Sequence, residues 1–196
     1  VYKDMGLVSQ VFTESDLAVL KGSLAIGHCR YSTTGSSTWV NAQPTLRPTK
    51  YGTIALAHNG NLTNTGDLAE LVSKLDPTPA RNGRGATTDT EIMTALIALQ
   101  NEKNVEASAL AVLPLLEGAF SLIFMDEHTL YAARDRHGVR PLVIGKLETG
   151  WVVASETAAL DIVGAAFVRE VEPGEFIAID QDGLRAHPWA LAEPKG

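Results

Sequence analysis

The chain has 196 residues, of which 45% are hydrophobic and 20% charged, and its formal net charge is −7. This composition is typical of one globular domain, since domains usually contain roughly 100–200 residues. The acidic balance argues against nucleic acid or an anionic membrane as a partner, because either would require a basic face. The longest apolar stretch, residues 109–125, is interrupted by polar residues and Pro114 and is shorter than the roughly 20 apolar residues of a spanning helix.

The single cysteine, Cys29, cannot form a disulfide within the chain, which fits a cytoplasmic protein. His28 precedes it, but neighbouring residues of an extended segment point to opposite sides. We therefore interpret Cys29 as a small buried side chain and not as a nucleophile. The histidines and the cysteine do not have the spacing of a metal site, so we expect no metal in this chain.

In the first part of the chain, two short apolar runs predict buried strands that end in polar motifs, at residues 24–28 and 53–58. Residues 32–50 lie between them and are rich in Ser, Thr, Pro and Asn. We expect a long loop there, and long loops in compact domains are usually functional.

Helices follow in the middle of the chain. Apolar residues recur at helical spacing from about residue 64 to residue 75, and prolines then end the pattern. Thr88 or Asp89 is expected to cap a second helix that ends near residue 99. A third helix is expected over about residues 105–116.

The last third of the chain has the alternation of strands, with turn residues between the runs. A run of strands around central helices indicates an α+β fold with helices packed on antiparallel sheets. The expected strands are residues 119–125, 130–134, 142–146, 151–155, 175–180 and 184–188, with a short helix at residues 157–163.

The sequence GHCRYSTTG at residues 27–35 combines the guanidinium of Arg30 with several hydroxyl groups, including that of Thr33. A guanidinium matches the two oxygens of a carboxylate, and hydroxyl groups add hydrogen bonds. The segment therefore predicts an anion site. The alternative is a surface ion pair beside a Ser/Thr turn.

The sequence AHNGNL at residues 57–62 follows the second predicted strand. The amide of Asn59 and the backbone N–H of a following residue could stabilise an oxyanion, as in acyl transfer. An Asn-Gly pair also closes hairpins, although a helix, and not a returning strand, is predicted next. The motif alone leaves both interpretations open.

The sequence TTDTE at residues 87–91 places Asp89 and Glu91 in the first turn of a predicted helix, where the helix dipole favours carboxylates. Alternatively, one carboxylate points at a cationic group of a ligand. The basic segment RDRHGVRP at residues 134–141 could bind a phosphate, contact a partner domain or form a solvated turn.

These motifs, together with KDMGLV at residues 3–8, resemble those of the class II glutamine amidotransferases, and almost the whole chain is similar to the glutaminase domains of amidophosphoribosyltransferases. The resemblance implies the N-terminal-nucleophile hydrolase fold, a four-layer αββα sandwich of antiparallel sheets. It also implies that an N-terminal cysteine attacks glutamine, which yields glutamate and ammonia. A phosphoribosyltransferase domain then uses the ammonia to make 5-phosphoribosylamine from phosphoribosyl pyrophosphate, the first step of purine synthesis.

The resemblance also implies residue roles. Arg30 and Thr33 would hold the α-carboxylate of glutamine, and Asp89 would hold its α-ammonium group. Asn59 and the N–H of Gly60 would form the oxyanion hole. A zwitterionic substrate needs such a fixed cation and fixed anion.

The chain also departs from the family. The nucleophilic cysteine and the opening segment are absent, and Cys29 stands where the family commonly has threonine. We therefore expect residues 1–196 to form a partial glutaminase domain that lacks its first strands and is inactive alone. The phosphoribosyltransferase domain, Mg²⁺ and any iron–sulfur cluster would belong to other parts of a homo-oligomeric, cytoplasmic parent.

Two alternatives remain. Hexosamine-phosphate synthases and asparagine synthetases share this domain, but the hexosamine enzymes tend to have Trp and Ala where this chain has Tyr31 and Ser32. The second alternative is a non-catalytic module that binds glutamine or glutamate.

Overall fold

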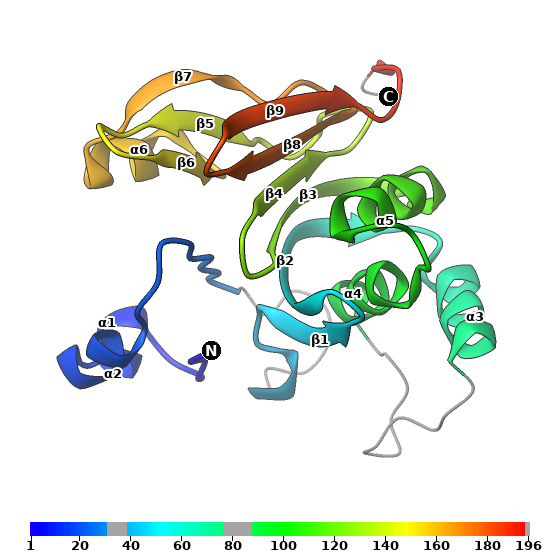
Figure 1. The fold of residues 1–196 in the computed structure, drawn as a ribbon, viewed down its shortest axis with the longest axis horizontal. Coiled ribbons are helices and arrows are strands. Elements are labelled where there is room, and N and C mark those ends of the chain that lie inside the picture. The colour runs from blue at the N-terminus through cyan, green and yellow to red at the C-terminus, as the bar shows by residue number, and fades with distance from the viewer. Residues whose placement is uncertain (31–38, 77–87, 195–196) are drawn as a thin grey trace.

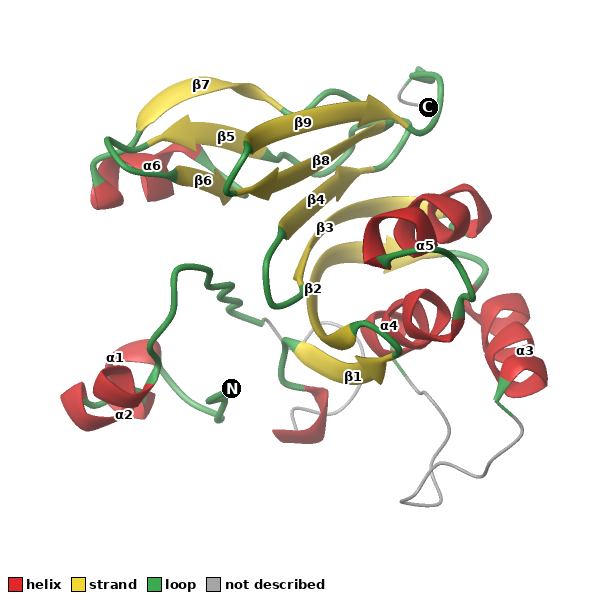
Figure 2. Cartoon of the chain, viewed as in Figure 1, coloured by secondary structure: helices red, strands yellow, loops and turns green. Residues whose placement is uncertain are grey.

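Two antiparallel sheets and the helices beside them make up the structure, a computed structural model that describes residues 1–30, 39–76 and 88–194 (Figures 1 and 2). The larger sheet has the strand order β1-β2-β3-β4-β8-β9, and all neighbouring strands are antiparallel. The predicted hairpins of the last third are therefore present in it as β3–β4 and β8–β9. Its strands are β1 (Thr45–Thr49), β2 (Gly52–Leu62), β3 (Gly118–Met125), β4 (Leu130–Arg134), β8 (Glu175–Asp180) and β9 (Gly183–Pro188).

The smaller sheet has the order β6-β5-β7 and is also antiparallel. The predicted β5–β6 hairpin and the short helix that follows it are confirmed. The elements of this layer are β5 (Val143–Lys146), β6 (Trp151–Ala154), α6 (Thr157–Val163) and β7 (Ala166–Glu170).

Three helices lie along one face of the larger sheet, where α4 contacts both of its neighbours and also β1 and β2 (Figure 2). The third predicted helix ends earlier than expected, because Pro114 falls in a short 3-10 turn and has no N–H to continue the α-helix. The helices are α3 (Thr65–Leu75), α4 (Asp89–Leu99) and α5 (Val105–Val112).

Three groups of buried apolar side chains separate the layers. The first fills the space between α3–α5 and the larger sheet and includes Leu96 and Phe124. The second lies between the two sheets and includes Ile144 and Ile177. The third, around Leu160, joins the smaller sheet to α6. The order of layers is therefore helix, sheet, sheet, helix, which confirms the predicted α+β sandwich.

The N-terminal residues 1–30 form an arm that contains two short helices, α1 (Val8–Val11) and α2 (Glu14–Val19). The strand predicted at residues 24–28 is wrong, because this segment is extended but pairs with no described strand. A strand requires a neighbour for its N–H and C=O groups, and the apolar run alone does not supply one.

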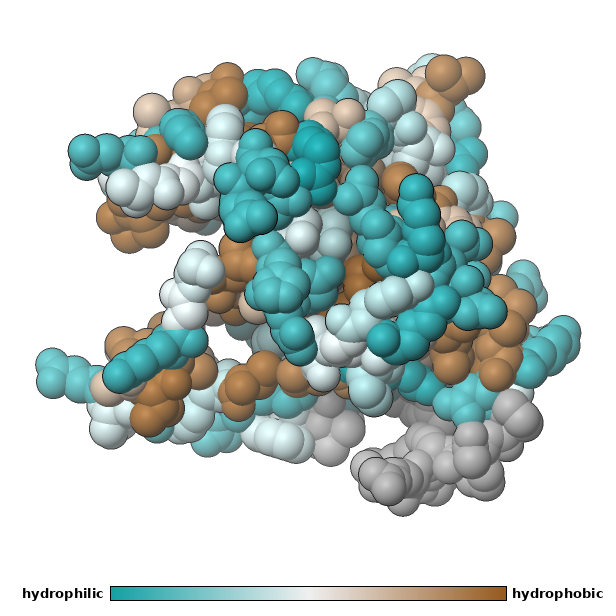
Figure 3. All heavy atoms as spheres, in the orientation of Figure 1, coloured by the Kyte–Doolittle hydropathy of each residue, from teal (hydrophilic) through white to brown (hydrophobic). Residues whose placement is uncertain are grey.

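The arm and the larger sheet line an open cavity of about 730 Å³. The arm supplies most of the lining, and Ala55 of β2 and Met125 of β3, which pair across the two strands, supply part of the opposite wall. Figure 3 shows hydrophobic residues gathered on the arm. Leu17 and Val19 of its helix α2 are exposed. The cavity therefore lies on the face of the larger sheet opposite to α3–α5.

Two strands differ from the sequence-based expectation. β1 lies inside the loop predicted at residues 32–50, and its Pro48 is tolerated because β1 is an edge strand. β7 was not predicted, since most of its side chains are exposed and no apolar alternation marks it.

Candidate functional site

The end of β2 carries the AHNGNL motif, and side chains complete the hydrogen bonding of its outer edge. β1 pairs with β2 only as far as Leu56. Beyond that point, the N–H of His58 donates to Oε1 of Gln43 at 2.6 Å, and the N–H of Leu62 donates to Oδ2 of Asp89 at 2.8 Å. Two side chains from different parts of the chain thus take the places that a longer β1 would have filled.

Gly60 lies between these two hydrogen-bonded positions. Its opposite residue on β3 is Phe120, whose N–H and C=O both bond Asp135, at 3.1 Å and 2.9 Å. Opposed residues of an antiparallel pair exchange either both hydrogen bonds or neither. The N–H of Gly60 therefore points away from β3, toward the edge of β2 beyond the end of β1.

The backbone conformation and surroundings of Gly60 exclude any residue with a side chain. Its φ is +147°, which L side chains rarely adopt. A Cβ atom there would lie 2.0 Å from the carbonyl oxygen of Ala119 and 2.8 Å from Cα of Phe120. The glycine of the motif is thus required by the close approach of β2 and β3.

The side chain of Asn59 lies on the face of β2 that Ala55 also presents to the cavity, because side chains alternate along a strand. Its cross-strand partner is Ser121, whose Oγ donates to the carbonyl of Arg140 at 3.2 Å. The loop that follows β4 therefore lies over the same face of the sheet as Asn59.

Helix α4 begins with a capping box, which explains its sharp start. Oγ1 of Thr88 accepts from the N–H of Glu91 at 3.2 Å, and a carboxylate oxygen of Glu91 accepts from the N–H of Thr88 at 3.3 Å. This confirms Thr88 as the cap and leaves Asp89 to bond Leu62. Asp89 thereby ties the start of α4 to the end of β2, two residues after Gly60.

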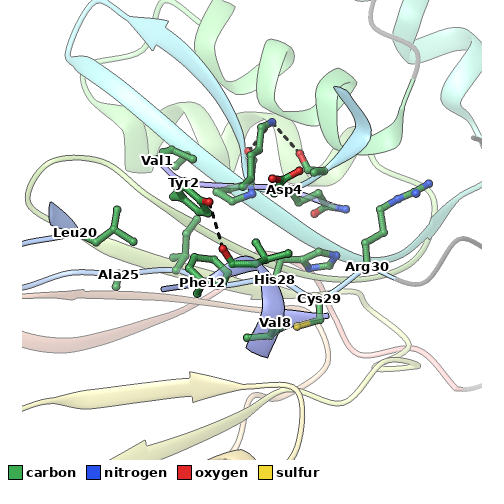
Figure 4. Close-up of a pocket in the computed structure, with 18 of the residues that line it drawn as sticks. Val1, Tyr2, Asp4, Val8, Phe12, Leu20, Ala25, His28, Cys29 and Arg30 are labelled. Carbon is green, nitrogen blue, oxygen red and sulfur yellow. Dashed lines mark hydrogen bonds between the residues drawn. The ribbon is translucent and has the colours of Figure 1, made fainter. Parts of the chain in front are cut away.

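Arg30 lies at one end of the cavity, and its side chain extends away from most of the lining residues (Figure 4). Cys29 and His28 point to opposite sides of the extended segment (Figure 4), and Cys29 is exposed, so the prediction that it is buried is wrong. Burial and the charge of Arg30 lower the pKa of His28. The cavity end is therefore cationic, with a histidine held in its neutral form.

His58 is a site feature that the sequence analysis missed. Its side chain is only 5% exposed, and its Nε2 has no hydrogen-bond partner among the described residues. Burial, then the charges of His28 and Arg140, lower its pKa to about 4. The motif contained the residue, but only the structure shows that its side chain is buried and that Arg140 lies close enough to lower its pKa.

The structure brings Asn59, Gly60 and Asp89 to the same end of β2. Within residues 1–30, 39–76 and 88–194, no hydrogen bond or ion pair joins Arg30 to Asp89. Thr33 falls outside the described residues. Binding of the α-carboxylate of an amino acid by Arg30 and Thr33, and of its α-ammonium group by Asp89, thus remains a prediction.

The described part of the chain contains no group of three His, Cys, Asp or Glu side chains placed to hold a metal ion. None of its helices has the length and apolar character needed to cross a membrane.

Comparison with known proteins identifies the family. Residues 28–162 match the family model described as "Glutamine amidotransferase domain". The chain belongs to this glutamine amidotransferase domain family. Arg30, Asn59, Gly60 and Asp89 all lie inside the matched range.

Close relatives of this glutamine amidotransferase domain are amidophosphoribosyltransferases. That of Mycobacterium tuberculosis (strain ATCC 25618 / H37Rv) is 57% identical over 198 residues, which cover 100% of this chain and 38% of that protein. That of Synechocystis is 48% identical over 199 residues, which cover 96% of this chain and 38% of that protein. The chain thus spans little more than a third of the length of these relatives.

A solved structure agrees with this assignment. The glutamine phosphoribosylpyrophosphate amidotransferase of B. subtilis, complexed with ADP and GMP, superposes on the glutamine amidotransferase domain with a TM-score of 0.84 and 36% identity. The match covers 94% of this chain and 39% of that chain. Sequence and fold therefore place the chain in the same family.

Proposed function

We propose that this chain is the glutaminase part of an amidophosphoribosyltransferase. In that role it would bind glutamine, whose side-chain amide is hydrolysed to glutamate and ammonia. The ammonia would pass to a phosphoribosyltransferase domain and convert phosphoribosyl pyrophosphate into 5-phosphoribosylamine. The support is the family match over residues 28–162 and the relatives' shared name.

The observation that carries the proposal is the edge of β2 at Gly60. Its N–H points outward between two N–H groups that Gln43 and Asp89 already occupy. Together with the amide of Asn59, this N–H would donate to the carbonyl oxygen of the glutamine side chain as negative charge develops on it. Fixed donors of this kind stabilise the transition state because they need no reorganisation during the reaction.

The charged ends of glutamine would be held by Asp89 and Arg30. Oδ2 of Asp89 already accepts from the N–H of Leu62, so its orientation is set before a ligand binds, and Oδ1 remains for an α-ammonium group. Arg30, with Thr33, would bind the α-carboxylate through paired N–H···O bonds. Binding both ends would fix the side-chain amide at Asn59 and Gly60.

The attacking thiolate would come from the N-terminal cysteine that the resemblance assigns, with release of ammonia and then hydrolysis of the thioester by water. Cys29, the one cysteine in these 196 residues, is exposed and turned away from His28 (Figure 4). We therefore expect this chain alone to bind glutamine without releasing ammonia. A cytoplasmic parent that is a homo-oligomer, with Mg²⁺ and an iron–sulfur cluster bound outside this chain, is part of the same proposal.

The test compares two ligands by calorimetric titration of the chain: L-glutamine, and glutaramate, which lacks the α-ammonium group. Asp89→Asn keeps an acceptor for Leu62 but removes the charge. We expect it to weaken glutamine binding about 10- to 100-fold, as for the loss of a charged hydrogen bond, and to leave glutaramate binding within about twofold. Asp67→Asn is the matched control, because Asp67 is an exposed acid in the first turn of α3.

Two results would contradict the proposal. One is an equal loss of affinity for both ligands in Asp89→Asn, which would assign Asp89 a structural role only. The other is ammonia release from glutamine by this chain that disappears in Cys29→Ala, because the nucleophile would then lie elsewhere than proposed.

A further inference from the structure

The segment between β4 and β5 is built around two buried charged residues. Arg134 is 5% exposed and Asp135 is 1% exposed. Burial of charge is unfavourable unless hydrogen bonds satisfy it, and here both side chains are used to fix the backbone of residues 135–141. The segment is therefore an ordered turn held by Asp135 and Arg134, with residues 139–141 exposed at its end.

Arg134 supplies most of these bonds. Its Nε donates to the carbonyl of Arg140 at 2.8 Å, and its Nη2 donates to the carbonyl of Gly138 at 2.9 Å. Its Nη1 donates to Glu170 at 2.9 Å and to the carbonyl of Val171 at 2.7 Å. One buried guanidinium thus connects the middle and the end of the segment to Glu170 and Val171.

Asp135 holds the start of the same segment. Its Oδ1 accepts from the N–H of His137 at 2.8 Å, and its carbonyl accepts from the N–H of Gly138 at 3.0 Å. Its Oδ2 bonds the N–H of Phe120, the same contact that turns the N–H of Gly60 outward. The segment is therefore bonded to the β3 residue directly opposite Gly60.

These hydrogen bonds fix the backbone of Arg140 at the end of the segment. Its carbonyl accepts from two groups, Nε of Arg134 and Oγ of Ser121, while its side chain is exposed. Ser121 is the cross-strand partner of Asn59, and side chains directly opposite each other lie about 5 Å apart at Cβ. The backbone of Arg140 is thus fixed within reach of the Asn59 side chain, and no described carboxylate forms an ion pair with its guanidinium.

Arg140 adds positive charge near this end of β2, although the chain carries a net charge of −7. Arg140 and His28 both disfavour a proton on His58, and Arg30 disfavours one on His28. The guanidinium of Arg140 therefore lies close enough to the end of β2 to act on His58, and that of Arg30 acts on His28 in the arm. A local field of this sign favours an anionic ligand.

We propose that Arg140 binds the side-chain carboxylate of glutamate, so that the site distinguishes glutamate from glutamine at the end held by Asn59. This rests on the proposed function, because it takes the amino acid to lie with its side chain at Asn59 and Gly60. Hydrolysis replaces the amide nitrogen with a negatively charged oxygen at that position. The guanidinium of Arg140, carried on a fixed backbone, pairs with a carboxylate there but gains little from a neutral amide.

The experiment is calorimetric titration of the 196-residue chain with L-glutamate and with L-glutamine. Arg140→Gln is expected to weaken glutamate binding by about tenfold or more and to leave glutamine binding within about twofold. Arg136→Gln is the matched control, since Arg136 lies on the same segment but pairs with Glu193 at 3.1 Å, and it should change neither affinity. Raising the ionic strength should weaken glutamate binding to the unsubstituted chain more than to Arg140→Gln.

The outcomes separate this inference from the proposed function. Equal affinity changes for the two ligands in Arg140→Gln, or the same loss in Arg136→Gln, would overturn the inference while glutamine binding still supports the proposed function. Absence of binding of either ligand to the folded, unsubstituted chain would contradict the proposed function and this inference with it.

Discussion

The buried imidazole of His58 makes the stability of the fold depend on pH. Its pKa is lowered to about 4 in the folded chain, first by burial and then by the charges of His28 and Arg140. In the unfolded chain the pKa is about 6.5. The unfolded state therefore binds a proton more readily, so the contribution of the neutral imidazole is complete near pH 7 and is lost as the pH falls from about 6.5 to about 4.

The size of the effect follows from these two pKa values. Between pH 7 and pH 5, linkage predicts a loss of about 2 kcal/mol in the free energy of unfolding from His58 alone. For a chain of this size, that corresponds to a fall in Tm of roughly 4–8 °C. The effect is a large fraction of a typical folding free energy of about 5–15 kcal/mol.

The assay is urea unfolding of the unsubstituted chain and of His58→Gln at the two pH values. Glutamine does not titrate, so groups that do not interact with His58 contribute equally to both proteins and cancel in the comparison. The unsubstituted chain should lose about 2 kcal/mol more than His58→Gln. NMR titration of the His58 ring provides an independent measurement that needs no variant. Equal losses in both proteins, or a ring that titrates near pH 6.5, would refute the reasoning.

Two further substitutions test the packing of the site. Gly60→Ala should lower the free energy of unfolding by more than about 2 kcal/mol, because the added Cβ would collide with Ala119. In the control, Gly66→Ala in the first turn of α3, the added Cβ meets open space, so the free energy of unfolding should stay unchanged or rise by up to about 1 kcal/mol. Urea unfolding measures both. Arg134→Gln should lower the free energy of unfolding by about 3 kcal/mol or more, since it leaves buried carbonyl groups without donors. Arg136→Gln should lower it by less than about 1 kcal/mol. Similar losses in the two variants would show that the burial of Arg134 matters little.

The elements with a strong local signal could be predicted from sequence. α4 has a capping box at Thr88, and its bounds are nearly those expected, because both the cap and the apolar pattern are local. The hairpins after residue 118 were likewise recognisable from alternation and turn residues. By contrast, the extended residues 24–28 pair with none of the strands that the structure describes, which no local pattern reveals. β1 was missed because its Pro48 and polar residues are tolerated only at a sheet edge.

The candidate site shows the same limit. The motif at residues 57–62 identified Asn59 and Gly60, and the helix start identified Asp89. Their meeting depends on the 2.8 Å bond from Leu62 to Asp89, which joins residues 27 positions apart. Such contacts depend on the whole fold and not on any short stretch of sequence, so neither the role of Gln43 nor the approach of Arg140 could have been predicted from sequence alone.

The side chains of Gln43 and Asp89 also protect the rim of the larger sheet. A bare strand edge offers a row of unpaired donors and acceptors that another polypeptide can join, which is a common route to aggregation. Here the donors on either side of Gly60 are already occupied, so an incoming strand would find one isolated N–H in place of a ladder. That single donor can serve a lone oxygen atom of a small molecule, but it cannot template the addition of a further chain.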